Sequence, residues 1–123
     1  MPEHVHVIVH PRRHEYSIAD ILRLIKLPVS RRAMQYLKRE APHWLARLTR
    51  QRGTRTERLF WQSGGGYDRN IDDPATLLKM IDYVHHNPVR RGLTQSPLDW
   101  AWSSAGDYAD VRQGLVPVER PSL

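Results

Sequence analysis

The pattern of polar and apolar residues near the start of the chain, with histidines and valines alternating at positions 4 to 7, predicts a β-strand. Residues 3 to 10 read Glu-His-Val-His-Val-Ile-Val-His, and Pro11 ends the run. Side chains in a strand point to opposite faces in turn. We therefore expect His4 and His6 on one face of this strand and the valines that separate and follow them on the other.

Apolar residues at helical spacing predict two helices in the next part of the chain. Ser17 is a suitable N-cap for the first helix, with Asp20 three positions later. Proline lacks the backbone donor that a helix interior needs, so Pro28 should end or kink this helix near Lys26. A second helix is expected to begin at Ser30 and to end at about residue 40. The apolar positions of the two helices are Ile18, Ile21, Leu22, Ile25, Met34 and Leu37.

A third helix has the clearest boundaries. Asp73 is its expected cap, and Pro74 occupies the first helical position. Pro88 should end the helix by Asn87. Its apolar stripe consists of Leu77, Ile81 and Val84.

The connection between the second and third helices contains only short elements. Residues 43–50 are predicted to add a helical turn or two, and residues 51–56 to form a polar loop. Residues 59–62 are predicted as a short strand. A bend is expected at residues 63–66, because glycine accepts positive φ.

The part beyond the third helix is expected to be irregular, apart from a short helix at Asp107 and Tyr108. Trp100 and Trp102 are expected to dock this part against the body. The order strand, helices, short strand, helix is an α+β layout. Two strands make a poor sheet, so either further strands are hidden in the sequence or the chain lacks them.

Composition indicates one modest globular core: the chain has 123 residues, of which 40% are hydrophobic and 26% charged. No apolar run approaches the roughly 20 residues that span a bilayer, and the lack of cysteine excludes disulfides and thiolate metal sites. A net charge of +6 favours a nucleic-acid partner, although a solvated basic face has the same appearance. The candidate DNA-binding residues are Arg47, Arg50, Arg52, Arg55, Arg58, Arg90 and Arg91.

His4 and His6 are candidates for a metal site. Two imidazoles side by side can chelate a divalent cation, with one further ligand supplied from elsewhere in the fold. Histidines at this spacing also occur as surface or packing residues, so the pair alone leaves both interpretations open.

Tyr83 and Asn87 share one face of the third predicted helix, because four residues separate them. That face lies opposite the apolar stripe, so Tyr83 is available as a nucleophile and Asn87 as a third metal ligand through its amide oxygen. An oxygen ligand beside two imidazoles suits Mg²⁺ or Mn²⁺. A half-buried helix tyrosine and an asparagine C-cap are the structural alternatives.

A tyrosine beside such a metal has the groups needed to attack a phosphodiester. A phenol ordinarily has a pKa of about 10, so it needs a neighbouring cation to ionise at neutral pH. A metal ion can also bind a phosphate oxygen and stabilise an in-line displacement. The product is a covalent phosphotyrosine, which conserves the bond energy for rejoining.

Four motifs follow one another along the chain. They are Met1-Pro2-Glu3-His4-Val5-His6, Phe60-Trp61-Gln62 with Tyr67-Asp68-Arg69-Asn70-Ile71, Tyr83-Val84-His85-His86-Asn87-Pro88-Val89-Arg90-Arg91-Gly92-Leu93, and Trp102-Ser103-Ser104. This ordered set covers residues 1 to about 108. It resembles the REP-associated tyrosine transposases, which belong to the single-tyrosine HUH transposase-like superfamily.

The resemblance implies a ferredoxin-like HUH fold with a central antiparallel sheet. It also implies an enzyme that cuts and rejoins single-stranded DNA, often at hairpins, through a 5′-phosphotyrosine intermediate. The nucleophile falls on Tyr83, and the ligands of Mg²⁺ or Mn²⁺ fall on His4, His6 and Asn87. We expect the protein to act in the cytoplasm, associated with the nucleoid, as a monomer or a homodimer on single-stranded or hairpin DNA.

In this family the Met-Pro-Glu-His segment usually follows a first strand, a helix and a second strand. We therefore expect residues 1–108 to be a partial, N-terminally truncated transposase-like HUH domain, followed by a C-terminal tail at residues 109–123. Two further interpretations stay open. One is a catalytically inactive basic DNA-binding remnant, and the other is an unstable product that does not fold.

Overall fold

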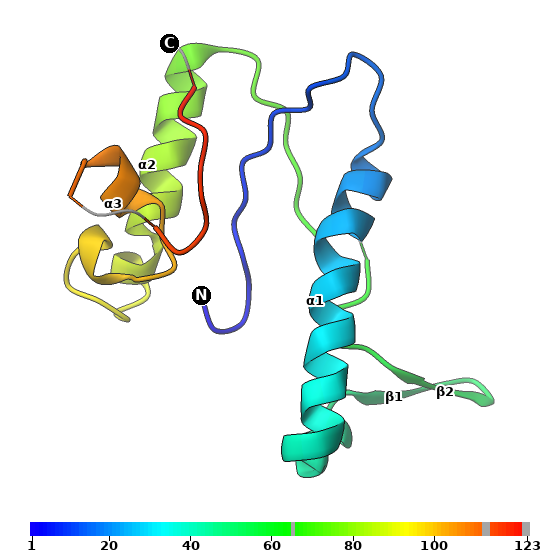
Figure 1. Ribbon diagram of the computed structural model, residues 1–123. Helices are drawn as coiled ribbons and strands as arrows, with labels where there is room; N and C mark the ends of the chain where they lie inside the picture. The colour runs from blue at the N-terminus through cyan, green and yellow to red at the C-terminus, as the bar shows by residue number, and fades with distance from the viewer. Residues whose placement is uncertain (65, 112–113, 122–123) are drawn as a thin grey trace. The chain divides into compact units, whose positions relative to one another are not determined.

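The computed structural model describes residues 1–64, 66–111 and 114–121 (Figure 1). It contains two units, one formed by Met1–His10 with Asn70–Leu123 and the other by Pro11–Arg69. Helices and a two-stranded antiparallel sheet make the described part α+β, as predicted. In chain order the elements are α1 (Ile18–Glu40), the 3₁₀ helix η1 (Pro42–Leu45), β1 (Thr49–Arg52), β2 (Arg55–Arg58), α2 (Pro74–Arg90), the 3₁₀ helix η2 (Pro97–Asp99) and α3 (Ala105–Tyr108).

Helix α1 is one continuous helix, so the helix end predicted near Pro28 and the separate helix predicted from Ser30 are wrong. Its N-terminus is as expected, with the Ser17 hydroxyl accepting from the backbone N–H of Asp20 at 3.2 Å. Ser30 is not a second cap, because its hydroxyl donates to the carbonyl of Leu27 at 3.0 Å. The half-buried positions keep helical phase across the proline, which explains why the helix continues: Ile21, Leu22, Ile25, Ala33, Met34 and Leu37.

The segment predicted as a polar loop is instead an antiparallel β-hairpin. Strand β1 pairs with β2, with Arg52 opposite Arg55 next to the turn. Gly53 has φ +59° at the first central position of the two-residue turn, the pattern of a type II′ hairpin. The helical turns predicted for residues 43–50 are limited to η1, which precedes β1.

Residues 59–62 form no strand, contrary to the prediction. Trp61 instead holds this segment on α1, because its indole N–H donates to the carbonyl of Lys26 at 2.9 Å. Gly64 and Gly66 adopt φ +104° and +87° in the region of the predicted bend, while Gly65 lies outside the described residues. The strand predicted at residues 3–10 is also wrong, because no other described segment pairs with this backbone.

Helix α2 begins at its predicted cap and continues past its predicted end. Pro88 lies inside the helix, which runs one turn further to Arg90. The backbone N–H of Gly92 then bonds to Val89 O, and that of Leu93 to Pro88 O, both at 2.9 Å. This pair of bonds is a Schellman closure, and φ +67° at Gly92 explains why glycine stands there. A proline near the end costs the helix only one hydrogen bond, so the helix survives it.

In the unit formed by Met1–His10 and Asn70–Leu123, the buried side chains come from α2 and α3. Ile81 and Ala105 are 8% and 5% exposed, and Asn87 is a buried polar residue at 7%. The short helix predicted around Asp107 is confirmed as α3. The predicted docking of Trp102 is wrong, because this side chain is 72% exposed. No described helix has both the length and the apolar character needed to cross a membrane.

Candidate active site

Helix α2 carries two of the predicted site residues on one face. Ile81 is buried on the opposite face, which sets the rotation of the helix. Tyr83 is 40% exposed and presents its phenol near the surface, whereas Asn87, one turn later, is buried. Asn87 lies within α2 and is not its C-cap, because Arg91 holds that position. The helix therefore offers a phenol and an amide to whatever lies against this face.

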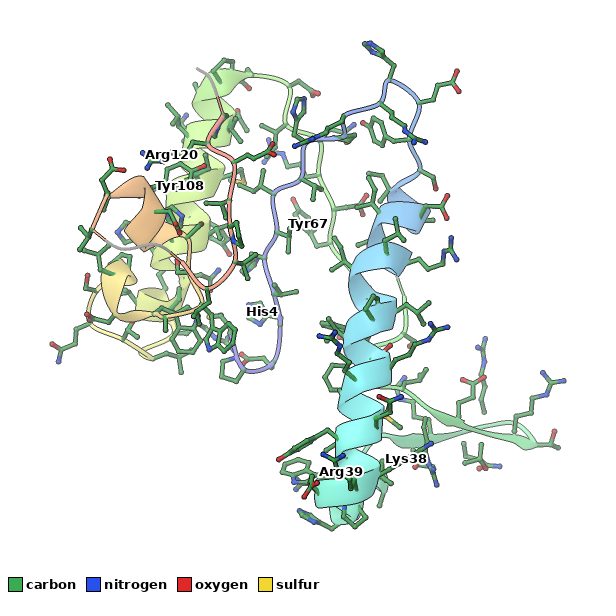
Figure 2. All side chains as sticks on the ribbon, in the orientation of Figure 1. His4, Lys38, Arg39, Tyr67, Tyr108 and Arg120 are labelled. Atoms are coloured by element: carbon green, nitrogen blue, oxygen red, sulfur yellow. The ribbon has the colours of Figure 1, made fainter. Side chains whose placement is uncertain are left out.

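The N-terminal segment brings its histidines to this face of α2. His6 Nε2 lies 2.9 Å from the side-chain amide of Asn87, a contact between residues 81 positions apart in the sequence. The rings of His6 and Tyr83 lie edge to face, with centroids 5.8 Å apart. His4, seen on the N-terminal segment in Figure 2, stands edge to face with His6 at 4.9 Å. The structure thus gathers His4, His6, Tyr83 and Asn87, although the segment carrying the histidines is not a strand.

The donor set of this cluster fits a divalent cation. Burial lowers the pKa of His6, and the neighbouring His4 lowers it further. A neutral imidazole keeps a lone pair for a metal. No three histidine or acidic side chains cluster as a metal site within the described residues, so a third ligand here would have to be the Asn87 amide. The oxygen and nitrogen of that amide exchange places by a half-turn, so either can face His6.

Glu3 supports the histidine pair, and sequence reasoning missed it. Arg91 donates a hydrogen bond to Glu3 Oε1, which ties the N-terminal segment to the end of α2. The same oxygen lies 3.7 Å from His4 Nδ1. The hydrogen bond from Arg91 is the main cause of the lowered pKa of the Glu3 carboxyl. The distance between Glu3 and His4 exceeds that of a hydrogen bond, so the contact between them is electrostatic. The available signal was the acidic residue directly before the histidine motif.

Arg90 also contacts Tyr83, and the sequence did not predict this contact. Its guanidinium carbon lies 4.9 Å from the centroid of the Tyr83 ring, in a cation–π contact. The two residues are seven positions apart, so they share a helix face only because α2 continues past Pro88. Arg90 therefore places a positive charge beside the phenol ring.

The two histidines of α2, His85 and His86, contact residues outside the cluster at His6. His85 Nε2 lies 2.9 Å from the hydroxyl of Ser104, and its ring packs against Tyr108. Burial lowers the pKa of His85. His86 pairs with Asp82, one turn earlier on the same helix. Neither histidine contacts the cluster at His6 among the interactions of the described residues.

The remaining predicted DNA-binding residues belong to the other unit, Pro11–Arg69. Arg47 lies over the ring of Trp44 at 4.7 Å, and Arg50 donates to the hydroxyl of Ser63 at 3.2 Å. Three more arginines stand exposed on the hairpin: Arg52, Arg55 and Arg58. The structure therefore gathers the predicted basic residues into two separate groups, one in each unit.

The chain resembles a named transposase along nearly its whole length. A curated protein of Haemophilus influenzae, named "Putative REP-associated tyrosine transposase", is 23% identical over 117 residues. The match covers 95% of this chain and 60% of that protein. No family model matches the chain, and no solved structure matches it. The similarity supports that family at most.

Proposed function

We propose that this chain belongs to a single-tyrosine transposase or nickase that cuts and rejoins single-stranded DNA. Tyr83 is the nucleophile, and the fold is part of a ferredoxin-like HUH domain. One observation carries the proposal: His6 contacts both the Asn87 amide and the Tyr83 ring. A histidine that serves packing alone does not require contact with both a phenol and an amide. Here both groups lie on one helix face, far along the chain from His6. The similarity to the Haemophilus influenzae protein supports the same reaction class.

The reaction exchanges one phosphate ester for another. The Tyr83 hydroxyl oxygen attacks the phosphorus of a DNA phosphodiester, and the bond from phosphorus to the 3′ oxygen breaks. The phenol proton passes through water to the leaving 3′ oxygen, which departs as a hydroxyl. The 5′ end stays on the protein as a phosphotyrosine. A 3′-hydroxyl then attacks that phosphorus, which rejoins a strand and returns the proton to Tyr83.

The residues around Tyr83 have distinct tasks in this proposal. His4, His6 and Asn87 would hold Mg²⁺ or Mn²⁺, which would supply charge stabilisation to the phosphoryl transfer. Arg90 binds a phosphate oxygen, because its guanidinium already lies against the phenol ring. Glu3 and Arg91 fix the orientation of His4.

A second candidate function is a DNA-binding protein without catalysis. The observation that favours it is the basic hairpin, which lies in the unit that does not contain Tyr83. Such a protein would bind DNA with a strong salt dependence and would form no covalent product.

Covalent adducts separate the two candidates. The protein is incubated with a labelled single strand and Mn²⁺, and products are resolved on a denaturing gel. We expect an adduct with the unmodified chain and none with Tyr83→Phe. Tyr67→Phe is the matched control, because Tyr67 is 90% exposed and belongs to the other unit (Figure 2). Adducts that persist in Tyr83→Phe, or that never form, would contradict the proposal.

A further inference from the structure

The β1–β2 hairpin presents arginines on both faces of a two-stranded ribbon. Residues opposite each other in an antiparallel pair share a face, and neighbours along a strand alternate. Arg50, Arg52 and Arg55 therefore stand on one face with Glu57, and Arg58 stands on the other with Thr49, Gln51 and Thr56. On the second face a side-chain hydrogen bond links the two strands, because the Thr56 hydroxyl donates to Gln51 Oε1 at 2.9 Å. The first face is the more strongly charged of the two.

The three arginines of the first face outnumber its one carboxylate, Glu57, which lies opposite Arg50. Arg52 lies directly opposite Arg55, and like charges in that position destabilise a hairpin. Neither arginine has a carboxylate within ion-pair distance among the described residues. Residues 47–58 contain five arginines and one glutamate, a net charge of +4. A repulsive pair at an exposed tip is the arrangement that a bound polyanion would stabilise.

The base of the ribbon is fixed, so its tip is presented in a defined direction. The Thr49 hydroxyl donates to Leu45 O at 2.7 Å, and Leu59 N–H donates to Leu48 O at 2.9 Å. Arg50 is tied to Ser63. In Figure 1 the two strands extend from the end of α1, and within the described part of the chain they pair only with each other. A ligand at the tip would therefore meet an element that is already ordered.

The composition of the ribbon favours a double-stranded partner over a single-stranded one. Surfaces that bind single strands without sequence preference combine basic residues with aromatic side chains, on which bases stack. Residues 49–58 contain no aromatic residue. A two-stranded ribbon fits the major groove of B-DNA, which is about 12 Å wide, and arginines on it reach the phosphates of both walls. We propose that the β1–β2 ribbon is a docking surface for duplex DNA, through Arg52 and Arg55 at its tip.

This inference goes beyond the cleavage chemistry and is independent of Tyr83. Binding is measured by fluorescence anisotropy with a labelled duplex and with a single strand of the same length, over a series of salt concentrations. We expect the unmodified chain to bind the duplex more tightly. Loss of two phosphate contacts in Arg52→Ala/Arg55→Ala should weaken duplex binding about 30-fold near 0.15 M salt and reduce the salt slope by about 1.8.

Two further variants make the result specific. Arg31→Ala/Arg32→Ala removes the same charge from exposed positions on α1 and should leave the salt slope unchanged. Arg52→Lys/Arg55→Lys keeps the charges and should retain the slope, since phosphates are met as point charges. An equal loss in the Arg31/Arg32 control would overturn the proposal, and so would a ribbon variant that weakens single-strand binding only. Neither result bears on adduct formation by Tyr83, so the two proposals fail separately.

Discussion

A double-mutant cycle on His6 and Asn87 measures how firmly the N-terminal segment is held on α2. The variants are His6→Ala, Asn87→Ala and the pair together. The hydrogen bond joins Nε2 of His6 to the Asn87 amide at 2.9 Å. Free energies of unfolding come from urea denaturation followed by circular dichroism, and the coupling energy is the departure of the double variant from additivity.

The expected magnitude follows from the burial of the two partners. Asn87 is 7% exposed, so His6→Ala leaves an amide without a partner or ready access to water, which costs about 1–3 kcal/mol. His6 is more exposed, so Asn87→Ala leaves a ring that water can reach, and the loss should be nearer about 1 kcal/mol. Removing both partners leaves no orphaned amide. We therefore expect a coupling energy of about 1 kcal/mol.

A control cycle pairs His6→Ala with His86→Ala. His86 lies beside Asn87 in sequence but bonds to Asp82, and shares no partner with His6. Its coupling with His6 should stay within about 0.3–0.5 kcal/mol. A coupling between His6 and Asn87 no larger than this control would show that the segment is not held as described, and the site would lose its basis.

Three further predictions concern the surroundings of the site. Glu3→Gln should raise the Kd for Mn²⁺ about tenfold or more while the fold persists, as measured by electron paramagnetic resonance. An unchanged Kd would show that Glu3 does not position His4. Hydrogen bonds from Thr76 lower the pKa of Asp73 from 3.8, so the cap stabilises α2 above that value and loses its effect as pH falls through the folded-state pKa. The Tm of the unmodified chain should accordingly fall more steeply below about pH 4 than that of Asp73→Asn, and parallel curves would contradict this. Gly92→Ala should cost about 1 kcal/mol in urea denaturation because Gly92 has φ +67°, whereas no loss would mean that the closure of α2 tolerates a side chain.

The parts of the fold that follow from local rules were predictable. Ser17 and Asp73 are caps because their side chains accept from backbone donors three residues later. The spacing of Tyr83 and Asn87 placed them on one face of α2, where the structure has them. These features depend only on neighbours within one or two helical turns, so the sequence contains the information needed.

The errors have two physical causes. Proline was treated as a helix terminator, but Pro28 and Pro88 each remove a single donor, and the surrounding helix tolerates that loss. The hairpin was missed because its strands are exposed and polar, so no apolar alternation marks them. Long-range contacts such as that of Glu3 with Arg91 leave no local signal at all.

The central claim is that Tyr83 itself becomes bonded to DNA. The most direct measurement digests the covalent adduct with protease and nuclease and locates the remaining nucleotide by mass spectrometry. The chain has five tyrosines, and the peptide that carries the nucleotide identifies which of them was modified. We expect a phosphate-linked nucleotide on the peptide that contains Tyr83 and on no other. A nucleotide on Tyr16, Tyr36, Tyr67 or Tyr108, or a failure to form any adduct with metal present, would contradict it.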